Sequence, residues 1–301
     1  MEQVSALRRG AHPAVIKRRS RLAIFRHKVL PKVITYLILL LGSVGFLLPF
    51  IWMLSSSLKT PGEIFIFPPK WLPSSPQWGN YPRSLTEQPF GRYTINTLTI
   101  TSLTLLGTLV SCSLVAFGFA RIRGAGSNFL FGLVLATMML PGQVTMIPTF
   151  ILFRILGWVD TLKPLIVPSF FGSAFFIFLL RQFMMTVPLE MDEAATIDGC
   201  SPFGVYWRIM LPMSKPALAT VAIFSFMDHW TDLMGPLIYL NSRNNYTIAI
   251  GLATYRQKYA TETPWNLLMA ASIVTMMPTL ILFFLSQRIF IQGIVVTGLK
   301  G

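Results

Sequence analysis

Long runs of apolar residues alternate with shorter polar segments along most of the chain. A helix needs about 20 mainly apolar residues to cross the hydrocarbon core of a bilayer, and six stretches meet this requirement. They are residues 33–55, 94–120, 128–152, 164–182, 216–240 and 267–289. None of them has the short alternating pattern that is typical of an outer-membrane β-barrel. The pattern therefore predicts an all-α integral membrane protein with a six-transmembrane-helix bundle.

Composition and charge add an orientation to this prediction. Of the 301 residues 53% are hydrophobic and only 12% are charged, with a mean hydropathy of +0.61. The net charge of +14 does not indicate a nucleic-acid partner, because nine of the 25 Lys and Arg lie in residues 1–32. Basic residues beside a first span hold that end of a protein in the cytoplasm. We therefore expect a basic cytoplasmic tail (1–32) and a six-helix transmembrane domain (33–301), with both termini cytoplasmic.

Residues 188–216, between the fourth and fifth predicted spans, lack a membrane-length apolar run. Three acids follow Pro188, at Glu190, Asp192 and Glu193, where negative charge suits the positive end of a helix dipole. Gly199 stands where such a helix is expected to end. A second helix is expected to begin at Ser201-Pro202 and to be closed by Pro212 and Pro216. The segment thus predicts a helix-turn-helix, which the six-span topology places in the cytoplasm.

One motif in this segment resembles that of a known family. It consists of Glu193, Ala194, Ala195, Gly199, Ile209, Leu211 and Pro212. The spacing is similar to the "EAA" loop of ABC-importer inner-membrane permeases. An ordinary loop with a chance E-A-A is the alternative, but the glycine, isoleucine and Leu-Pro at family spacing favour the resemblance. It implies that these residues, with Asp198, dock into a cleft on an ATP-hydrolysing subunit.

The resemblance also implies partners and a solute. The stretches M-L-P-G-Q-V-T-M-I-P-T-F and G-W-V-D-T are similar to the sugar-type branch, which includes the maltose/oligosaccharide and glycerol-phosphate permeases. In that branch the shorter of two paired permeases works with a second permease subunit, two ATPase subunits that hold ATP and Mg, and an extracytoplasmic solute-binding protein. A sugar or oligosaccharide is therefore the implied solute. A bacterial or archaeal cytoplasmic membrane is the implied location.

The fifth predicted span contains two carboxylates, which are rare in membrane helices. Asp228 and Asp232 are four residues apart, hence on one helix face, and Trp230 between them lies on another. One hypothesis is a solute path, in which the acids bind sugar hydroxyls and Trp230 stacks on the ring, with Gln143 as a further member. The other hypothesis is structural: the acids cap or cross-link helices, or lie near the outer interface. The sequence leaves both open.

The small residues and the prolines within the spans predict how the helices pack and where they bend. The second span is rich in Thr, Ser, Gly and Ala, which allow close helix approach in lipid, so we expect it at the centre of the bundle. Pro141 and Pro148 are expected to kink the third span, and Gly235-Pro236 to bend the fifth. The segment after Arg288 has few charges and is expected to be extended.

The sequence contains no motif that indicates catalysis. Cys112 is expected within a span and Cys200 in a cytoplasmic loop, so neither a disulfide nor a metal cluster is predicted. Ser/His/Asp groupings, HExxH and phosphate-binding glycine loops are absent. We expect a chain without catalytic residues, metal or cofactor of its own. The alternative function is a proton- or ion-coupled secondary carrier, in which Asp228 and Asp232 form the relay.

Overall fold

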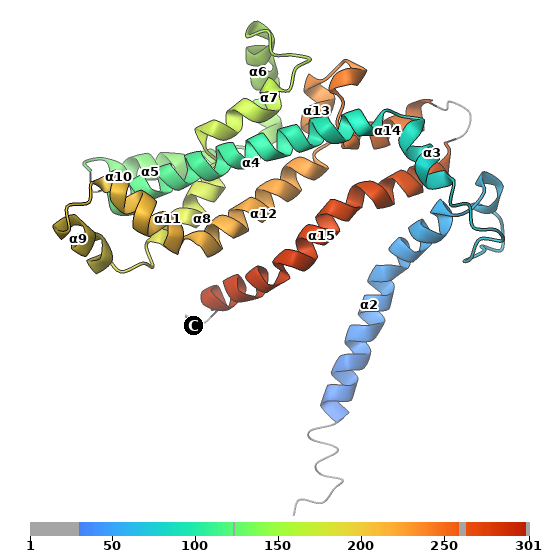
Figure 1. Cartoon of the computed structure of the whole chain (residues 1–301), viewed down its shortest axis with the longest axis horizontal. Helices are drawn as coiled ribbons and strands as arrows, with labels where there is room; N and C mark the ends of the chain where they lie inside the picture. The colour runs from blue at the N-terminus through green and yellow to red at the C-terminus, as the bar shows by residue number, and fades with distance from the viewer. Residues whose placement is uncertain (1–29, 123, 259–262, 299–301) are drawn as a thin grey trace, which may run out of the picture. The chain divides into compact units, whose positions relative to one another are not determined.

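The computed structural model describes residues 30–122, 124–258 and 263–298, in which every regular element is helical (Figure 1). The chain divides into two units, one ending at Met53 and the other beginning at Leu54. Within the described ranges, four helices are long and apolar enough to cross a membrane. Two bent helix pairs raise the number to six if each pair is counted as one span. The predicted all-α class is confirmed.

The first unit consists of the apolar helix α2 (Leu30–Ser57), whose last turn belongs to the second unit. Its 28 residues correspond to about 42 Å of helix, enough to cross a bilayer. Residues 30–51 are all exposed. The first predicted span, 33–55, is therefore a continuous helix whose side chains are suited to contact with lipid.

The second unit is organised around α4 (Phe90–Arg121). This helix packs against α8 (Ala174–Met184), α12 (Lys215–Thr231) and the 3₁₀ helix η3 (Val167–Phe171), as Figure 1 shows. Its small residues permit this packing: a Cβ at Gly107 would lie 2.6 Å from Ser169 Oγ. The prediction that the second span is central is confirmed within the second unit.

The third predicted span, 128–152, is not one helix. It forms α5 (Ser127–Thr137) and α6 (Gly142–Ile155), which meet at an angle of 95°. Pro141 precedes α6 in an extended conformation, with ψ of 133°. Proline disfavours helical geometry in the residue before it and cannot donate a backbone hydrogen bond. The expected kink is thus a complete break.

The fourth predicted span is also interrupted. The short helix α7 (Lys163–Ile166) and η3 are separated from α8 by Gly172, whose φ is +88°. The backbone N–H of Ser173 donates to Cys112 Sγ of α4 at 3.2 Å. A polar group of the broken backbone is thereby satisfied inside the protein, as membrane depth requires.

The fifth predicted span, 216–240, is not one continuous helix. Helix α12 ends at Thr231, and a separate helix, α13 (Met234–Tyr239), follows. The break lies at Asp232, which is extended with ψ of 121°, and not at Gly235-Pro236 as predicted. Helix α12 instead forms a bent pair with Pro202–Met213, at 75°.

The remaining helices lie in the segments that connect the spans and at the end of the chain. They are η2 (Pro61–Glu63), α3 (Asn80–Thr86), η5 (Arg243–Asn245), α14 (Ile248–Lys258) and α15 (Trp265–Gly298). The buried Asn80 side chain joins α3 to residues 57–59 and to α15: its Nδ2 donates to the carbonyls of Ser57 and Lys59 at 2.8 and 3.1 Å, and its Oδ1 accepts from Asn266 Nδ2 at 3.2 Å. Helix α15 contains the last predicted span, 267–289, but stays helical to Gly298 where an extended segment was expected.

Candidate functional site

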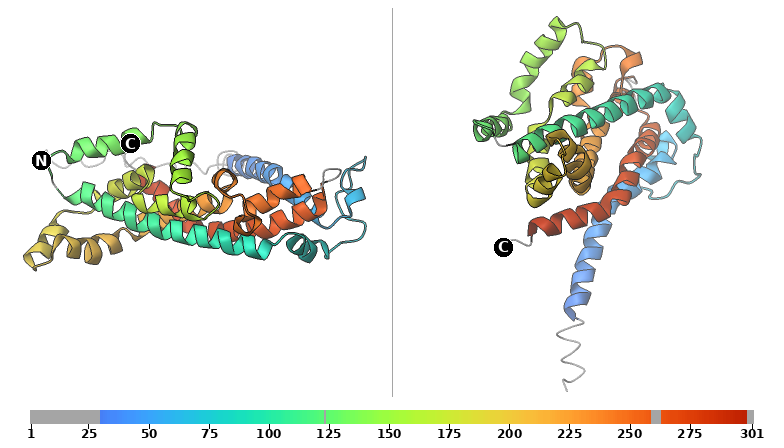
Figure 2. Two further views of the ribbon diagram at one scale, coloured as in Figure 1. Left: turned by 90° about the horizontal axis from the view of Figure 1, so that it is seen from above. Right: turned by 60° about the vertical axis from the view of Figure 1, so that its left-hand side comes forward.

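The 188–216 segment begins with helix α9 (Glu190–Ile197), as predicted. It lies at one end of α4, and α3 lies at the other (Figures 1 and 2). Gly199, two residues after the end of the helix, has a φ of +84°. The N–H of Cys200 donates to Ala195 O at 2.9 Å, and that of Gly199 donates to Thr196 O at 3.0 Å. These two bonds form a Schellman motif, in which a left-handed glycine closes the helix. The predicted role of Gly199 in the turn is confirmed.

The second helix of the segment also begins as predicted. Ser201 Oγ accepts from the N–H of Gly204 at 3.2 Å, and Pro202 is the first helical residue. The helix then runs through α10 (Pro202–Val205), a π-turn (Tyr206–Met210) and α11 (Leu211–Met213). Pro212 lies inside this helix and Pro216 lies in the first turn of α12. The predicted end of the helix at these prolines is therefore wrong; the chain turns at Ser214.

One face of the segment belongs to the core of the second unit. The side chains of Ala195, Val205, Tyr206 and Met210 are buried in a cluster with residues of α4 and α8. Tyr206 also packs its ring against Phe117 at 5.3 Å. Ala195, which the motif assigned to docking, is only 7% exposed. Its small side chain allows α9 to lie close to the core, so it supports the segment from inside.

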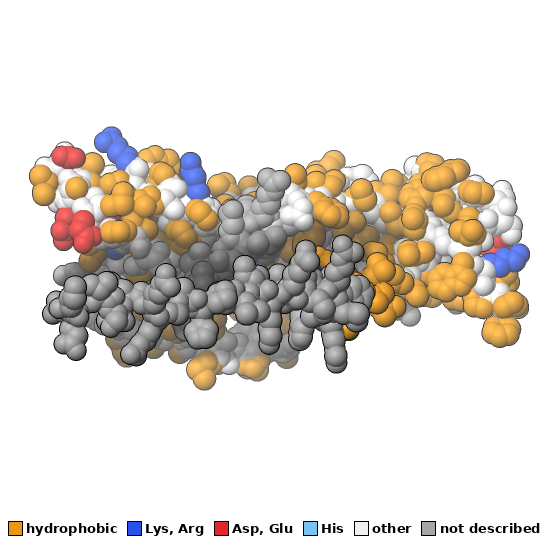
Figure 3. All heavy atoms as spheres, turned by 90° about the horizontal axis from the view of Figure 1, so that it is seen from below, with side chains coloured by type: hydrophobic (Ala, Val, Ile, Leu, Met, Phe, Trp, Pro, Cys, Tyr) orange, Lys and Arg blue, Asp and Glu red, His pale blue; other side chains and the backbone are white. Residues whose placement is uncertain are grey.

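The other motif residues divide between solvent and the core. Glu193, Ala194, Asp198, Gly199 and Pro212 are exposed, whereas Ile209 and Leu211 are half-buried and pack against the core cluster. Figure 3 shows acidic side chains over α9, at one end of the second unit. Six large apolar side chains are exposed on the same segment: Leu189, Met191, Ile197, Phe203, Trp207 and Met213. The motif did not identify them, although apolar residues in a polar loop were visible in the sequence. Exposed acids around exposed apolar groups form a surface suited to a protein partner.

Arg121, the last residue of α4, makes a contact with α9 that the sequence did not reveal. Its Nε lies 2.9 Å from Asp192 Oδ2, and the Arg121 side chain is 6% exposed. Its Nη2 donates to the carbonyl of Val187 at 2.7 Å. Arg121 and Asp192 are far apart in sequence, and only the signs of their charges hinted at the pair.

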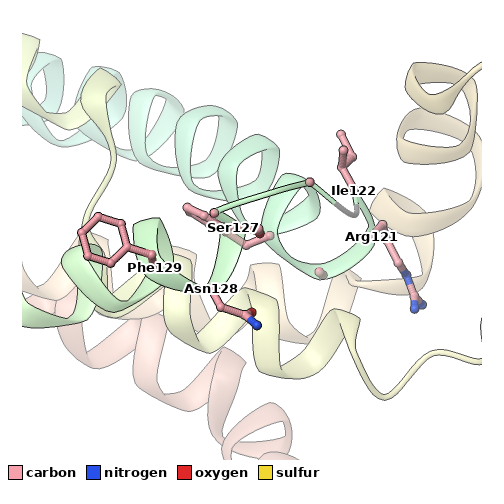
Figure 4. Close-up of a pocket in the computed structure, with 9 residues that line it drawn as sticks. Arg121, Ile122, Ser127, Asn128 and Phe129 are labelled. Atoms are coloured by element: carbon pink, nitrogen blue, oxygen red, sulfur yellow. The ribbon is translucent and has the colours of Figure 1, made fainter.

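Two depressions adjoin this end of the second unit. One, of about 510 Å³, is lined by Arg121, Leu189, Asp192, Glu193, Thr196 and Ile197. The other, of about 310 Å³, lies where α4 connects to α5, and Figure 4 shows the Arg121 guanidinium directed away from Asn128 and Phe129 there.

Within the described ranges, no three His, Cys, Asp or Glu side chains are grouped to hold a metal ion. Cys112 and Cys200 are free.

The four candidate solute-path residues do not share either depression. Trp230 is 6% exposed, stacks on Phe226 at 5.3 Å and donates from Nε1 to Thr275 O at 3.0 Å. Its ring is therefore a packing element between α12 and α15 in this conformation. Asp232 Oδ1 accepts from the N–H of Gly235 at 3.1 Å and so caps α13, as the structural hypothesis predicted. Asp228 and Gln143 are exposed.

Comparison with known proteins identifies relatives of the whole membrane domain. Residues 107–296 match the family described as binding-protein-dependent transport system inner membrane component. A probable ABC transporter permease protein of Bacillus subtilis, YurM, is 34% identical over 268 residues, which are 88% of each chain. The arabinooligosaccharides transport system permease protein AraQ of Halalkalibacterium halodurans is 36% identical over 68% of this chain and 73% of its own length.

A solved structure shares the fold. It is a bacterial ABC transporter involved in the import of the acidic polysaccharide alginate, and one of its chains matches with a TM-score of 0.78 and 21% identity. The match covers 87% of this chain and 97% of that one. The alternative prediction, a proton- or ion-coupled carrier using Asp228 and Asp232, is not supported by any of these matches.

Proposed function

Because the chain belongs to the family of binding-protein-dependent transport system inner membrane components, we propose that it is a permease subunit of an ATP-driven importer of a sugar or oligosaccharide. A sugar is supported by the arabinooligosaccharides named for one relative and the alginate named for the solved structure. The chain contributes the path and the mechanical coupling. ATP and Mg would be held by the partner, so ATP hydrolysis would take place outside this chain.

One observation carries the proposal: the 188–216 segment has a docking face and a core face. Its exposed acids and apolar side chains are available to a partner, while Tyr206 and Met210 are buried against the bundle. Motion of a docked ATPase subunit would therefore be transmitted to the transmembrane helices, because packed interiors move as rigid units rather than deforming. The segment can act as a coupling element.

The assembly we propose contains four further proteins. A second, similar permease would complete the central cavity, and each permease would dock one of two ATPase subunits. A binding protein outside the membrane would deliver the solute, in keeping with the family's description. The basic residues 1–32 favour a cytoplasmic N-terminus, and six spans return the C-terminus to the same side. Docking to an ATPase requires the 188–216 segment to be cytoplasmic as well.

The proposed solute path includes residues of the third and fifth predicted spans. Asp228 and Gln143 have exposed side chains that can reach a cavity, while Asp232 and Trp230 would shape it through the cap and the packing described above. Carboxylates in spans normally face a cavity or a partner rather than lipid. Asp228→Ala is thus expected to lower the rate of uptake without changing the amount of assembled complex.

Gly199 provides a direct test of the coupling element. No atom lies within 4 Å of a Cβ added there, so only the backbone conformation, with φ of +84°, resists substitution. We would compare Gly199→Val with Gly199→Asn, because asparagine tolerates this conformation and a β-branched residue does not. The valine variant is expected to lose co-purification of the ATPase subunit, and the asparagine variant to retain it. Solute flux by the purified chain without any ATPase would overturn the proposal.

A further inference from the structure

The end of α4 is joined to the first turn of α9 by an ion pair that is largely removed from water. Arg121 Nε lies 2.9 Å from Asp192 Oδ2, and the two side chains are 6% and 16% exposed. The other two acids of that turn, Glu190 and Glu193, are exposed and point their charge to solvent. Of these three neighbouring acids, only Asp192 is therefore paired with a side chain inside the protein.

The Arg121 guanidinium contacts three places in and beside the 188–216 segment. Its Nη2 donates to the carbonyl of Val187, just before α9, at 2.7 Å. It also lies 3.8 Å from the sulfur of Met210, in the second helix. The entry to the segment, α9 and the second helix are thus each in contact with one residue of α4. Arginine suits this role because its planar group presents several donors in fixed directions.

Such a pair adds little net stability, because the cost of removing both charges from water offsets their attraction. Two apolar side chains would serve equally well as packing. What the pair provides is a defined position, since neither charge has its counter-ion unless the other is in place. Asp192 Oδ1 and Arg121 Nε are both buried without a hydrogen-bond partner, so the contact between the two groups is ionic. This arrangement is more demanding than packing alone requires.

We propose that the Arg121–Asp192 pair is the positioning contact that makes α9 and α4 move as one body. Displacement of α9 by a docked ATPase would then reach α4, the central helix of the second unit, without loss. The inference rests on the proposed function, and it adds the residues through which that function is transmitted. Arg121 and Asp192 are positioning residues, distinct from the exposed docking face.

The test uses the assembled importer in liposomes, with its second permease, ATPase subunits and binding protein. Solute uptake per ATP hydrolysed is the measured ratio. If the wild-type complex shows no uptake that depends on ATP and the binding protein, the proposed function itself fails. If the wild-type complex does show such uptake, Asp192→Asn is expected to lower the ratio of solute uptake to ATP hydrolysed by about fivefold or more. Its ATPase subunits should co-purify at the wild-type level.

Two variants serve as controls. Glu87→Gln removes the acid of the Arg83–Glu87 ion pair, which lies outside the 188–216 segment, and is expected to leave the ratio unchanged. Asp192→Glu keeps the negative charge and is expected to restore most of the ratio that Asp192→Asn loses. If Asp192→Asn does not assemble, Arg121→Lys decides: lysine leaves a positive charge near Asp192 but lacks the planar group that fixes the geometry of the pair, so the ratio should fall with assembly intact.

Three results would overturn the inference. One is a ratio of solute uptake to ATP hydrolysed in Asp192→Asn that equals the wild-type ratio. Where Asp192→Asn does not assemble, the same result in Arg121→Lys would overturn the inference. Another is loss of ATPase co-purification in Arg121→Lys, which would make the pair part of the docking surface. The third is an equal fall of the ratio in Glu87→Gln, which would trace the effect to the loss of any ion pair rather than to this one.

Discussion

The hydroxyl groups of Ser113 and Tyr206 lie 2.8 Å apart in the core, and this hydrogen bond joins α4 to the second helix of the 188–216 segment. Ser113 Oγ also donates to the carbonyl of Leu109 in its own helix. Because a serine hydroxyl has one proton, Tyr206 must be the donor of the bond between the two side chains. Both residues are buried, so neither hydroxyl can turn to water instead.

Tyr206→Phe and Ser113→Ala are therefore expected to differ in their effect on stability. The first removes a donor and leaves Ser113 bonded to Leu109, and we expect a loss of about 1 kcal/mol. The second leaves the buried Tyr206 hydroxyl unsatisfied, and we expect about 1–3 kcal/mol. Thermal unfolding of the purified chain in detergent measures both. Equal losses, or a larger loss for Tyr206→Phe, would show that Ser113 is the donor.

Gly107→Ala tests the close contact between α4 and the interrupted fourth span. The new Cβ would lie 2.6 Å from Ser169 Oγ and 2.8 Å from the Phe170 ring, so the two elements must move apart. Such overpacking usually costs about 1–3 kcal/mol. Gly118→Ala in the same helix is the matched control, because no atom lies within 4 Å of its added Cβ. A lower midpoint of thermal unfolding is expected for position 107, and equal midpoints for the two variants would contradict the contact.

Much of the fold could be predicted from the lengths of the apolar runs. Residues 33–55 and 94–120 fall within single helices, because each is long and apolar, and α2 continues through Pro49. The breaks were harder to predict. Pro141 predicted the break between α5 and α6. The break at Asp232 depends on a side chain that caps the next helix, and a pattern of hydrophobic residues does not reveal such a cap.

The candidate site shows the same division between local and distant interactions. The glycine turn and the Ser201 cap follow from local sequence, since the partners are within a few residues of each other. The burial of Ala195 and the pairing of Asp192 with Arg121 do not. Both depend on which face of α9 meets α4, and that is decided by packing between elements distant along the chain.

Asp232 distinguishes the structural hypothesis from the ion-coupled one. Its Oδ1 accepts from the N–H of Gly235, and an asparagine side chain can accept the same bond. Asp232→Asn is therefore expected to retain stability and uptake, while Asp232→Ala loses the cap at a cost of about 1 kcal/mol. Uptake in proteoliposomes and thermal unfolding measure the two effects. Loss of uptake in Asp232→Asn, together with dependence of the wild type on a proton gradient, would revive the carrier hypothesis.

Asp160 gives the second unit a pH dependence outside its spans. Its carboxylate accepts from the hydroxyl and N–H of Ser242, from the N–H of Asn241 and from Asn245 Nδ2. These bonds, chiefly those from Ser242, lower the pKa of Asp160 from 3.8 to about 2. A carboxylate whose pKa is lowered by folding stabilises the fold above its ordinary pKa and loses that effect as the pH falls through the lowered value.

Asp160→Asn should therefore destabilise the protein at neutral pH but not in strong acid. Asparagine tolerates the left-handed backbone at this position, where φ is 62°, so the change acts on the charge. We expect the midpoint of thermal unfolding to fall by about 2–4 °C at neutral pH. The difference from the wild type should shrink as the pH drops from about 4 toward 2. Glu190→Gln, at an exposed acid for which the structure gives no side-chain hydrogen bond, is the control. A difference that stayed constant across this range would mean that the loop between α6 and α7 is not held to Ser242 by the charge of Asp160.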